Sequence, residues 1–368
     1  MNYMKGFRSI RKLIILVLIN LFVVTLFIGC SSSTIEKNNK VETTNNKKVT
    51  DLSGRTVTIP GNITKVAALV GPSYEKMIML GQADKISISM PVSSKWAKVV
   101  APVLKNVTFT NSFKNPNIED LLAKKIQVAF FWDYTQPLNK MTSSKIPVLV
   151  TQESSKNPTN INEFVSFEKR EVQVYGNALG SEAKKKADKW CKYFDEKVKY
   201  VTSRTQKLKS SEIPKVYYVR GPDALTVHGR NSYTEWFVKM AGGDLVTKDT
   251  SKEIMDTVTM EQVSVWNLDV IFMGRVDNTG LIIKDPRWSN IKAVKNGKVF
   301  VNPEGVFYWD YSSEGPLLME FIAKTLHPDL FKDLNMIKEI KNYYSEFYNY
   351  NLTDDQANRI LNHMPPAN

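Results

Sequence analysis

The feature that most constrains the fold is an alternation of short β-rich runs with helical patterns, interrupted once. From residue 50 onward, strand-like runs such as KVAALV and QVAFFW alternate with helical patterns, and after Pro214 the alternation resumes with KVYYVRG and LDVIFMG. Strands that alternate with helices favour βαβ units and a mostly parallel sheet. We therefore predict an α/β protein built as two lobes.

The interruption is a long helical stretch between the lobes. Residues 181–209 are heavily charged and have helical periodicity, and about 28 residues at 1.5 Å each would span about 42 Å. A helix this long and polar usually lies across other elements, although an ordinary surface helix is the alternative. The expected organisation is an N-terminal lobe at 50–180, the helix at 181–209, a C-terminal lobe at 210–335 and a helical tail at 336–368.

One sequence unit occurs once in each lobe. Aligned without a gap, residues 117–132 (NIEDLLAKKIQVAFFW) and 259–274 (TMEQVSVWNLDVIFMG) each give a glutamate, a short helix and a strand. Glu119 then matches Glu261, and both lie in the first helical turn, where the helix dipole favours an acid by about 0.3–1 kcal/mol. That local effect would explain either glutamate alone, but the repetition favours a shared role.

The N-terminal segment indicates export and membrane attachment. A basic stretch precedes a long apolar run that ends at Gly29 and Cys30, which is typical of a secretory signal over residues 1–29. Cys30 resembles the acylated cysteine of a bacterial lipobox, with a plain transmembrane anchor as the alternative. Both place the remaining chain on the outer face of the cytoplasmic membrane. Residues 30–49 are polar and aperiodic, which predicts a flexible tether.

Charge and motifs narrow the class of function. The formal net charge of +13 suits nucleic acid, an anionic membrane surface or an anionic ligand, but no basic run interleaved with aromatics points to nucleic acid. The sequence has no HExxH, CxxC, GxSxG or P-loop motif. Its histidines and acids do not cluster at metal-ligand spacing. We expect no catalytic residue, no resident cofactor and no protein-bound metal, and an extracytoplasmic enzyme is the disfavoured alternative.

Aromatic and basic residues gather where the predicted strands end. Open α/β sheets bind ligands outside the carboxyl ends of their strands. Arginine pairs with carboxylates and other anions, and aromatic faces pack on a bulky apolar body. His228 is expected to be a hydrogen-bonded loop histidine, with metal ligation as the alternative. The candidates for the ligand site are Tyr74, Met90, Trp132, Tyr134, Arg220, Arg230, Arg275, Tyr308 and Trp309. The late loop also offers Tyr311, which alternates with Tyr308, so that one of the two is expected to point away.

Segments spread over about residues 50–335 together resemble the substrate-binding proteins of ABC importers for iron chelates and cobalamin. Those segments are DLSGRTVTIP with KVAAL, PSYEKMIMLGQADKI, IEDLLAKKIQVAFF, NSYTEWFVKMAGGDLV, DPRWSNIKAVKNGKVFVNP and SSEGPLLMEFIAKTLHPDLF. Their order and spacing carry the resemblance, rather than any single motif. It implies the class III periplasmic binding protein fold, in which one long rigid α-helix joins two Rossmann-like lobes.

The resemblance also implies partners and a ligand. In such proteins one surface glutamate per lobe docks on the permease dimer of an importer with a cytoplasmic ATPase, and Glu119 and Glu261 match those positions. The ligand lies in the cleft between the lobes. A ferric siderophore or haem is expected, with a corrinoid or an oxyanion such as molybdate or tungstate as alternatives. The helix between the lobes predicts a modest closure on the ligand, and we expect a monomer that is lipid-anchored through Cys30.

Overall fold

The computed structural model describes residues 45–367, apart from residues 111, 113, 154–156, 251 and 277. The predicted signal segment, Cys30 and most of the predicted tether lie outside the described residues. Within the described range, no helix is long and apolar enough to cross a membrane. The chain from Thr44 onward forms one compact unit.

The chain enters this unit through a two-stranded hairpin. β1 (Lys47–Thr50) pairs antiparallel with β2 (Thr56–Ile59). Gly54 occupies the turn with a φ of 77°, a conformation that costs glycine less than any other residue. β1 begins inside the range predicted as tether, because Val49 is buried in the core of the first lobe. The predicted tether of residues 30–49 is therefore too long at its C-terminal end.

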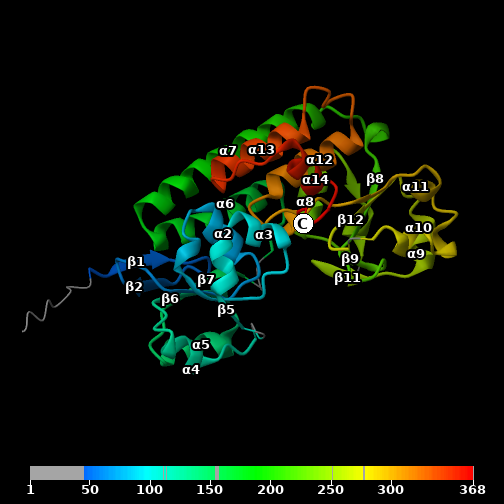
Figure 1. Cartoon of the computed structure of the whole chain (residues 1–368). Helices are drawn as coiled ribbons and strands as arrows, with labels where there is room; N and C mark the ends of the chain where they lie inside the picture. Colours follow the sequence, from blue (N-terminus) through cyan, green and yellow to red (C-terminus); the bar gives the residue numbers. More distant parts are fainter. Residues whose placement is uncertain are drawn as a thin grey trace, which may run out of the picture. The chain divides into compact units, whose positions relative to one another are not determined.

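The N-terminal lobe has a five-stranded parallel sheet with helices on both faces (Figure 1). Its elements are β3 (Val66–Ala68), α2 (Ser73–Met79), β4 (Ile86–Ser89), α3 (Lys95–Val100), β5 (Thr108–Phe109), α4 (Ile118–Ala123), β6 (Val128–Trp132), α5 (Thr135–Ser143) and β7 (Val148–Gln152). The strand order is β5-β4-β3-β6-β7. Separate apolar clusters cover the two faces, one including α2 and α3 and the other α4 and α5, as a buried parallel sheet requires.

Two long helices follow the first lobe. α6 (Ile161–Leu179) turns at Gly180 into α7 (Ser181–Thr205), and the two pack closely at Gly176, where a Cβ would lie 2.6 Å from the Cβ of Ala187. α7 is the predicted long helix, but it ends four residues earlier than predicted. There the chain turns, and the Thr205 hydroxyl donates to the Met240 carbonyl of the second lobe at 2.7 Å.

The C-terminal lobe has a mixed sheet. Its elements are β8 (Lys215–Val219), β9 (Thr226–His228), α8 (Tyr233–Met240), β10 (Asp244–Leu245), β11 (Met255–Thr257), α9 (Met260–Val265), β12 (Val270–Met273), α10 (Gly280–Ile283), α11 (Lys292–Lys295), β13 (Val299–Val301) and α12 (Gly315–Leu326). The strand order is β11-β9-β8-β12-β13, with β10 beside β8. β8, β10, β12 and β13 run parallel, whereas β9 pairs antiparallel with β8 and β11. Residues 220–225 alone join β8 to β9, and a parallel crossover needs about a dozen residues.

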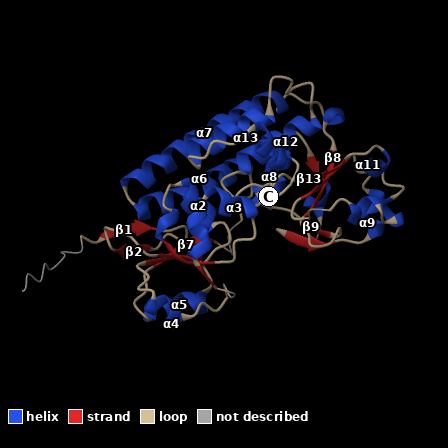
Figure 2. Ribbon diagram, in the orientation of Figure 1, coloured by secondary structure: helices blue, strands red, loops and turns tan. Residues whose placement is uncertain are grey.

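The C-terminal segment packs against both lobes. It contains α13 (Met336–Phe347) and α14 (Asp354–Leu361), and in Figure 2 it lies between α7 and the C-terminal lobe. Its backbone accepts a hydrogen bond from Trp96 Nε1 of the first lobe, at the Met364 carbonyl (2.9 Å). Its Tyr344 hydroxyl donates to Glu314 of the second lobe at 2.8 Å. We call residues 336–367 the C-terminal latch.

Candidate ligand-binding cavity

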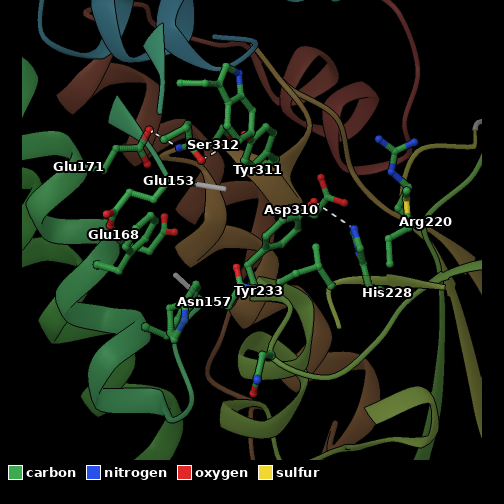
Figure 3. A pocket seen from close by; sticks show the side chains of 18 of the residues that line it. Glu153, Asn157, Glu168, Glu171, Arg220, His228, Tyr233, Asp310, Tyr311 and Ser312 are labelled. Atoms are coloured by element: carbon green, nitrogen blue, oxygen red, sulfur yellow. Dashed lines mark hydrogen bonds between the residues drawn. The ribbon is translucent and has the colours of Figure 1, made fainter. Parts of the chain in front are cut away.

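A cavity of about 580 Å³ lies between the two lobes. The first lobe contributes the ends of β6 and β7, α6 supplies one wall, and the second lobe contributes the ends of β8, β9 and β12 with α8. Figure 3 shows the side chains that converge on it. Charged and polar groups alternate with aromatic rings, a composition typical of small-molecule sites. The lining includes Lys76, Lys114, Trp132, Tyr134, Gln152, Glu153, Phe164, Phe167, Glu168, Glu171, Arg220, His228, Tyr233, Phe237, Met255, Arg275, Asp310 and Tyr311.

The wall formed by α6 is acidic. Glu171 is buried, pairs with Lys76 at 3.1 Å and accepts a hydrogen bond from Gln152 Nε2 at 2.7 Å. Glu168 lies one turn earlier on the same helix and is half-buried. The pKa of Glu168 is raised to about 8. The main cause is burial, followed by the charge of the neighbouring Glu171, and Lys76 offsets part of the increase. At neutral pH Glu168 therefore retains its proton in the empty cavity.

The opposite wall carries a buried ion pair. Arg275 follows β12, and its Nε lies 3.2 Å from Oδ1 of the fully buried Asp310. Its Nη2 donates to the Tyr233 hydroxyl at 2.5 Å. Gly274 allows this approach, since a Cβ there would lie 2.6 Å from the Tyr218 ring. The Arg275 charge is thus neutralised and fixed before any ligand arrives.

Arg220, at the end of β8, is the contrasting cation. It is half-buried, and Nη1 donates to the Gly221 carbonyl at 3.3 Å. Among the described residues no carboxylate lies within ion-pair distance of it. A guanidinium presents five donors in a planar fork that matches carboxylate and similar anions. Arg220 can therefore bind an anionic ligand group without first breaking an ion pair.

His228 is buried between the two arginines. Burial, followed by the charges of Arg275 and Arg220, holds the pKa of His228 well below its usual range, so the imidazole is neutral. Its Nε2 lies 3.1 Å from the Tyr233 hydroxyl, and Nδ1 has no partner within the described part of the chain. Since Arg275 already donates to Tyr233, we assign the Tyr233 proton to Nε2, which leaves the histidine hydrogen on Nδ1.

A comparison with protein families decides the class of this molecule. The family model described as periplasmic binding protein matches residues 66–305. The chain belongs to the periplasmic binding protein family. It is an extracytoplasmic solute-binding component of an ABC transporter, and its two α/β lobes joined by a long helix have the class III architecture. The fold and family predicted from the sequence are both confirmed.

Named relatives of this periplasmic binding protein differ in the solutes they take. It is 28% identical over 335 residues to the molybdate-binding protein MolA of Haemophilus influenzae, covering 84% of this chain and 93% of that protein. The structure of MolA bound to molybdate superposes with a TM-score of 0.76, at 26% identity, over 83% of this chain and 99% of that one. The Fe(3+)-citrate-binding protein YfmC of Bacillus subtilis is 24% identical over 310 residues, 79% of this chain and 89% of that protein.

The cavity of this family member brings together four of the nine predicted ligand residues. Trp132 and Tyr134 stack on each other, with ring centroids 5.5 Å apart and planes 11° from parallel, and Arg220 and Arg275 lie on the second-lobe side. His228, predicted to be a hydrogen-bonded histidine, makes the bond to Tyr233 described above. Within the described residues no group of three or more histidines, cysteines or acids converges as a metal site.

The other five predicted residues do not line the cavity. Tyr74 is buried in the first lobe, and its hydroxyl donates to the Val306 carbonyl at 3.1 Å. Trp309 is buried, and Tyr308 packs edge-on against Phe307 at 5.2 Å. Met90 is half-buried outside the cavity. Arg230 pairs with Glu253 at 3.6 Å on the surface. Arg230, Tyr308 and Trp309 lie in loops or turns after strands, and the strand pattern does not specify which way the backbone directs side chains there.

Several lining residues were missed by the sequence interpretation. Glu168 and Glu171 belong to α6, where acids at helical spacing look like an ordinary solvated face. Asp310 belongs to the loop that was already singled out for Tyr308, Trp309 and Tyr311, and of these three aromatics only Tyr311 lines the cavity. Tyr233 lies at the start of α8. The useful signal was the loop itself, since its consecutive residues Asp310, Tyr311 and Ser312 all line the cavity.

The repeated glutamates occupy equivalent places in the two lobes. Glu119 and Glu261 are both exposed and hold the second position of short helices that are capped by Asn117 and Thr259. The helices α4 and α9 each lead into a strand beside the first strand of their sheet, β6 next to β3 and β12 next to β8. The duplication seen in the sequence is thus a duplication of structure.

Proposed function

We propose that this solute-binding protein captures a metal chelate, a ferric siderophore or haem, and delivers it to its permease. The observation that carries the proposal is the size and chemistry of the cavity. A hydrated oxyanion needs space on the order of a few water molecules at about 30 Å³ each, whereas the cavity holds about 580 Å³. An adjoining open hollow of about 730 Å³ shares Glu153, Asn157 and Phe167 with it.

The lining also suits an organic chelate. The stacked Trp132–Tyr134 pair offers a flat surface, and Phe164, Phe167 and Phe237 add apolar area. Aromatic rings bury large apolar bodies at low entropic cost. Arg220 is available for an anionic group at the chelate's edge. The YfmC similarity supports this ligand class.

The test is a binding panel on the purified protein. Ferric citrate, a ferric trihydroxamate complex, haem, a corrinoid, molybdate and tungstate would each be titrated by calorimetry and by tryptophan fluorescence. We expect at least one metal chelate to bind in the micromolar range or tighter, and Trp132→Phe to remove most of the quenching while calorimetry still detects the ligand. Binding of none of the chelates would contradict the proposal.

Molybdate is the second candidate, and the MolA similarity favours it specifically. Arg220 would be its donor from the second lobe, since it has no carboxylate within ion-pair distance among the described residues. Calorimetry separates the candidates: if molybdate binds and every chelate in the panel does not, the oxyanion is the ligand. Sulfate is the control, because a site that merely attracts anions binds it as well.

Delivery would use Glu119 and Glu261, one from each lobe. Their equivalent positions and exposure support docking onto a pseudo-symmetric permease surface, since exposed charges set register and steer encounter. A Glu119→Ala/Glu261→Ala protein should bind ligand with unchanged affinity and fail to support uptake in cells. Uptake at the wild-type rate would leave the repeat as a feature of the fold alone.

Membrane attachment would use Cys30. Its place after an apolar run and Gly29 supports acylation, and a diacyl anchor holds a protein firmly at a membrane. Palmitate labelling of the expressed protein should be lost in Cys30→Ser. Labelling that persists in this variant would contradict the assignment.

A further inference from the structure

Two ionisable groups of the cavity, one acidic and one basic, have no ionic partner among the residues that the structure describes. Lys76 is matched by Glu171, and Arg275 by Asp310. Glu168 and Arg220 differ: within the described residues, the Glu168 carboxyl makes no hydrogen bond or ion pair, and Arg220 bonds only to a backbone carbonyl. Figure 3 shows Glu168 on α6 and Arg220 on a different wall of the cavity.

An acid that faces a half-buried site lowers the stability of the protein unless a cation or a hydrogen-bond donor pairs with it. Removing a carboxylate from water is unfavourable without a cation or hydrogen-bond donors. A protein that needed only an anion site would gain nothing from an ionisable acid in the same cavity, because the acid would repel the anion whenever it ionised. The juxtaposition instead fits a ligand with charges of both signs.

We propose that Glu168 selects a ligand that carries a protonated amine, while Arg220 holds the anionic groups at its other end. The inference rests on the proposed function and narrows it to chelates whose organic part bears an ammonium group. Arg220 and Glu168 then act as specificity determinants at the two ends of one cavity.

Proton release would accompany this recognition. The groups that face Glu168 are Glu171 on its own helix, Lys76 and Glu75 on α2 and Tyr233 on α8. In this setting the empty cavity keeps Glu168 protonated at pH 7. When an ammonium group arrives, the Glu168 O–H bond breaks, its proton passes to the buffer, and the resulting carboxylate pairs with the ammonium.

The experiment uses two matched probes: a ferric linear trihydroxamate complex with a carboxylate at one end and a primary amine at the other, and the same complex with that amine acetylated. Calorimetry at pH 7 in buffers of different ionisation enthalpy gives both affinity and proton release. We expect the wild-type protein to bind the amine complex at least tenfold more tightly, with release of up to one proton. Glu168→Gln should bind both complexes with the affinity that the wild type shows for the acetylated one, and release no proton.

Controls separate recognition from folding. Glu196→Gln removes an exposed acid of α7 whose side chain is 64% exposed, and should leave the tenfold preference unchanged. Equal affinity of the wild-type protein for the two complexes would overturn the inference while leaving the proposed function standing. Equal weakening of both complexes in Glu168→Gln would also overturn it, because that pattern indicates a structural role. Failure of every chelate in the panel would overturn the proposed function, and this inference with it.

Discussion

The two buried polar clusters between the lobes differ in how completely they are paired. At the C-terminal latch, Glu75 of α2 accepts hydrogen bonds from the latch residue Tyr348 at 2.6 Å and from the Ser313 backbone of the second lobe at 3.1 Å. Glu314 accepts from Tyr344 at 2.8 Å and from the Phe307 backbone at 3.2 Å. In the cavity, Glu168 and Arg220 have no ionic partner in the part of the chain that the structure describes. The buried acids at the latch are hydrogen-bonded by the protein itself, whereas the two cavity groups are available to bind a ligand.

This difference separates stability from binding. Buried polar groups that are fully hydrogen-bonded fix one arrangement of the elements around them. Since the latch bonds to α2 of the first lobe and to Glu314 of the second, it ties the lobes together on one side of the cleft. We therefore expect the lobes to close only modestly. Mutations in the latch should change the free energy of unfolding, and mutations of the unpaired cavity groups should change affinity.

The largest effect is expected from Glu75→Ala. It leaves the Tyr348 hydroxyl and the Ser313 backbone N–H without this acceptor. Each buried donor left without a partner costs about 1–3 kcal/mol, so we expect a total loss of about 2–6 kcal/mol in unfolding free energy. Urea denaturation followed by tryptophan fluorescence measures this loss. Tyr348→Phe is the matched variant and should cost about 1–2 kcal/mol, because it removes a single hydrogen bond. A loss below about 1 kcal/mol for Glu75→Ala would show that the latch is not what joins the lobes.

Next in size is the effect of removing a cavity arginine that is already paired. Arg275→Ala leaves Asp310 buried without its cation, and we expect a loss of about 3 kcal/mol in unfolding free energy. The double variant Arg275→Ala/Asp310→Asn should recover part of that loss, since no buried charge then remains. If the double variant is no more stable than the single one, the Arg275–Asp310 pair does not behave as a structural ion pair.

The sequence predicted the arrangement of helices and strands better than it predicted which side chains line the cavity. Strand and helix periodicity was sufficient for the two lobes, the long helix and the repeated unit, because burial imposes a period on every element. Strand ends also indicated where a ligand would lie, and Trp132 and Arg275 do line the cavity. What the pattern could not specify was the direction of side chains in loops. In the structure, Tyr311 faces the cavity and Trp309 is buried in the core. The sequence pattern did not distinguish these two directions.

The burial of Glu168 and Glu171 in the acidic wall of α6 could not be predicted from the sequence, for a different reason. Glu168 and Glu171 have the spacing of a solvated helix face, and their burial arises only when the second lobe and α2 pack against α6. Glu75 looks like an ordinary first-turn acid of α2, yet its partners Ser313 and Tyr348 come from more than 230 residues away. Charges are assigned to core or surface by tertiary contacts, which local periodicity does not encode.

A smaller, purely functional effect is expected from Arg220→Ala. Because Arg220 has no ionic partner among the described residues, its removal should change the unfolding free energy by less than about 0.5 kcal/mol. A charge-assisted hydrogen bond to a ligand is worth about 1.5–3 kcal/mol, so affinity for the chelate should fall about 10- to 100-fold by calorimetry. Arg220→Lys should recover only part of the loss, since an ammonium cannot form the bidentate pair. A destabilised protein with unchanged affinity would reverse the roles assigned to the latch and the cavity.

The smallest effect concerns pH. Glu168 has a pKa of about 8 in the folded protein against 4.5 as its ordinary value, so between these values the folded state binds more protons than the unfolded state. The slope of stability with pH is then negative: the contribution of Glu168 is most favourable below pH 4.5 and is lost as the pH rises toward 8. Since the side chain is partly exposed, we expect its share to stay below about 1 kcal/mol per pH unit.

Urea midpoints of the ligand-free protein at pH 5, 6, 7 and 8 should fall more steeply for the wild type than for Glu168→Gln. Other buried acids, such as Glu320 with a pKa of about 7, give both proteins a slope of the same sign. Parallel slopes would mean that Glu168 is already ionised in the empty cavity, and the distinction between a completed latch and an incomplete cavity would then rest on Arg220 alone.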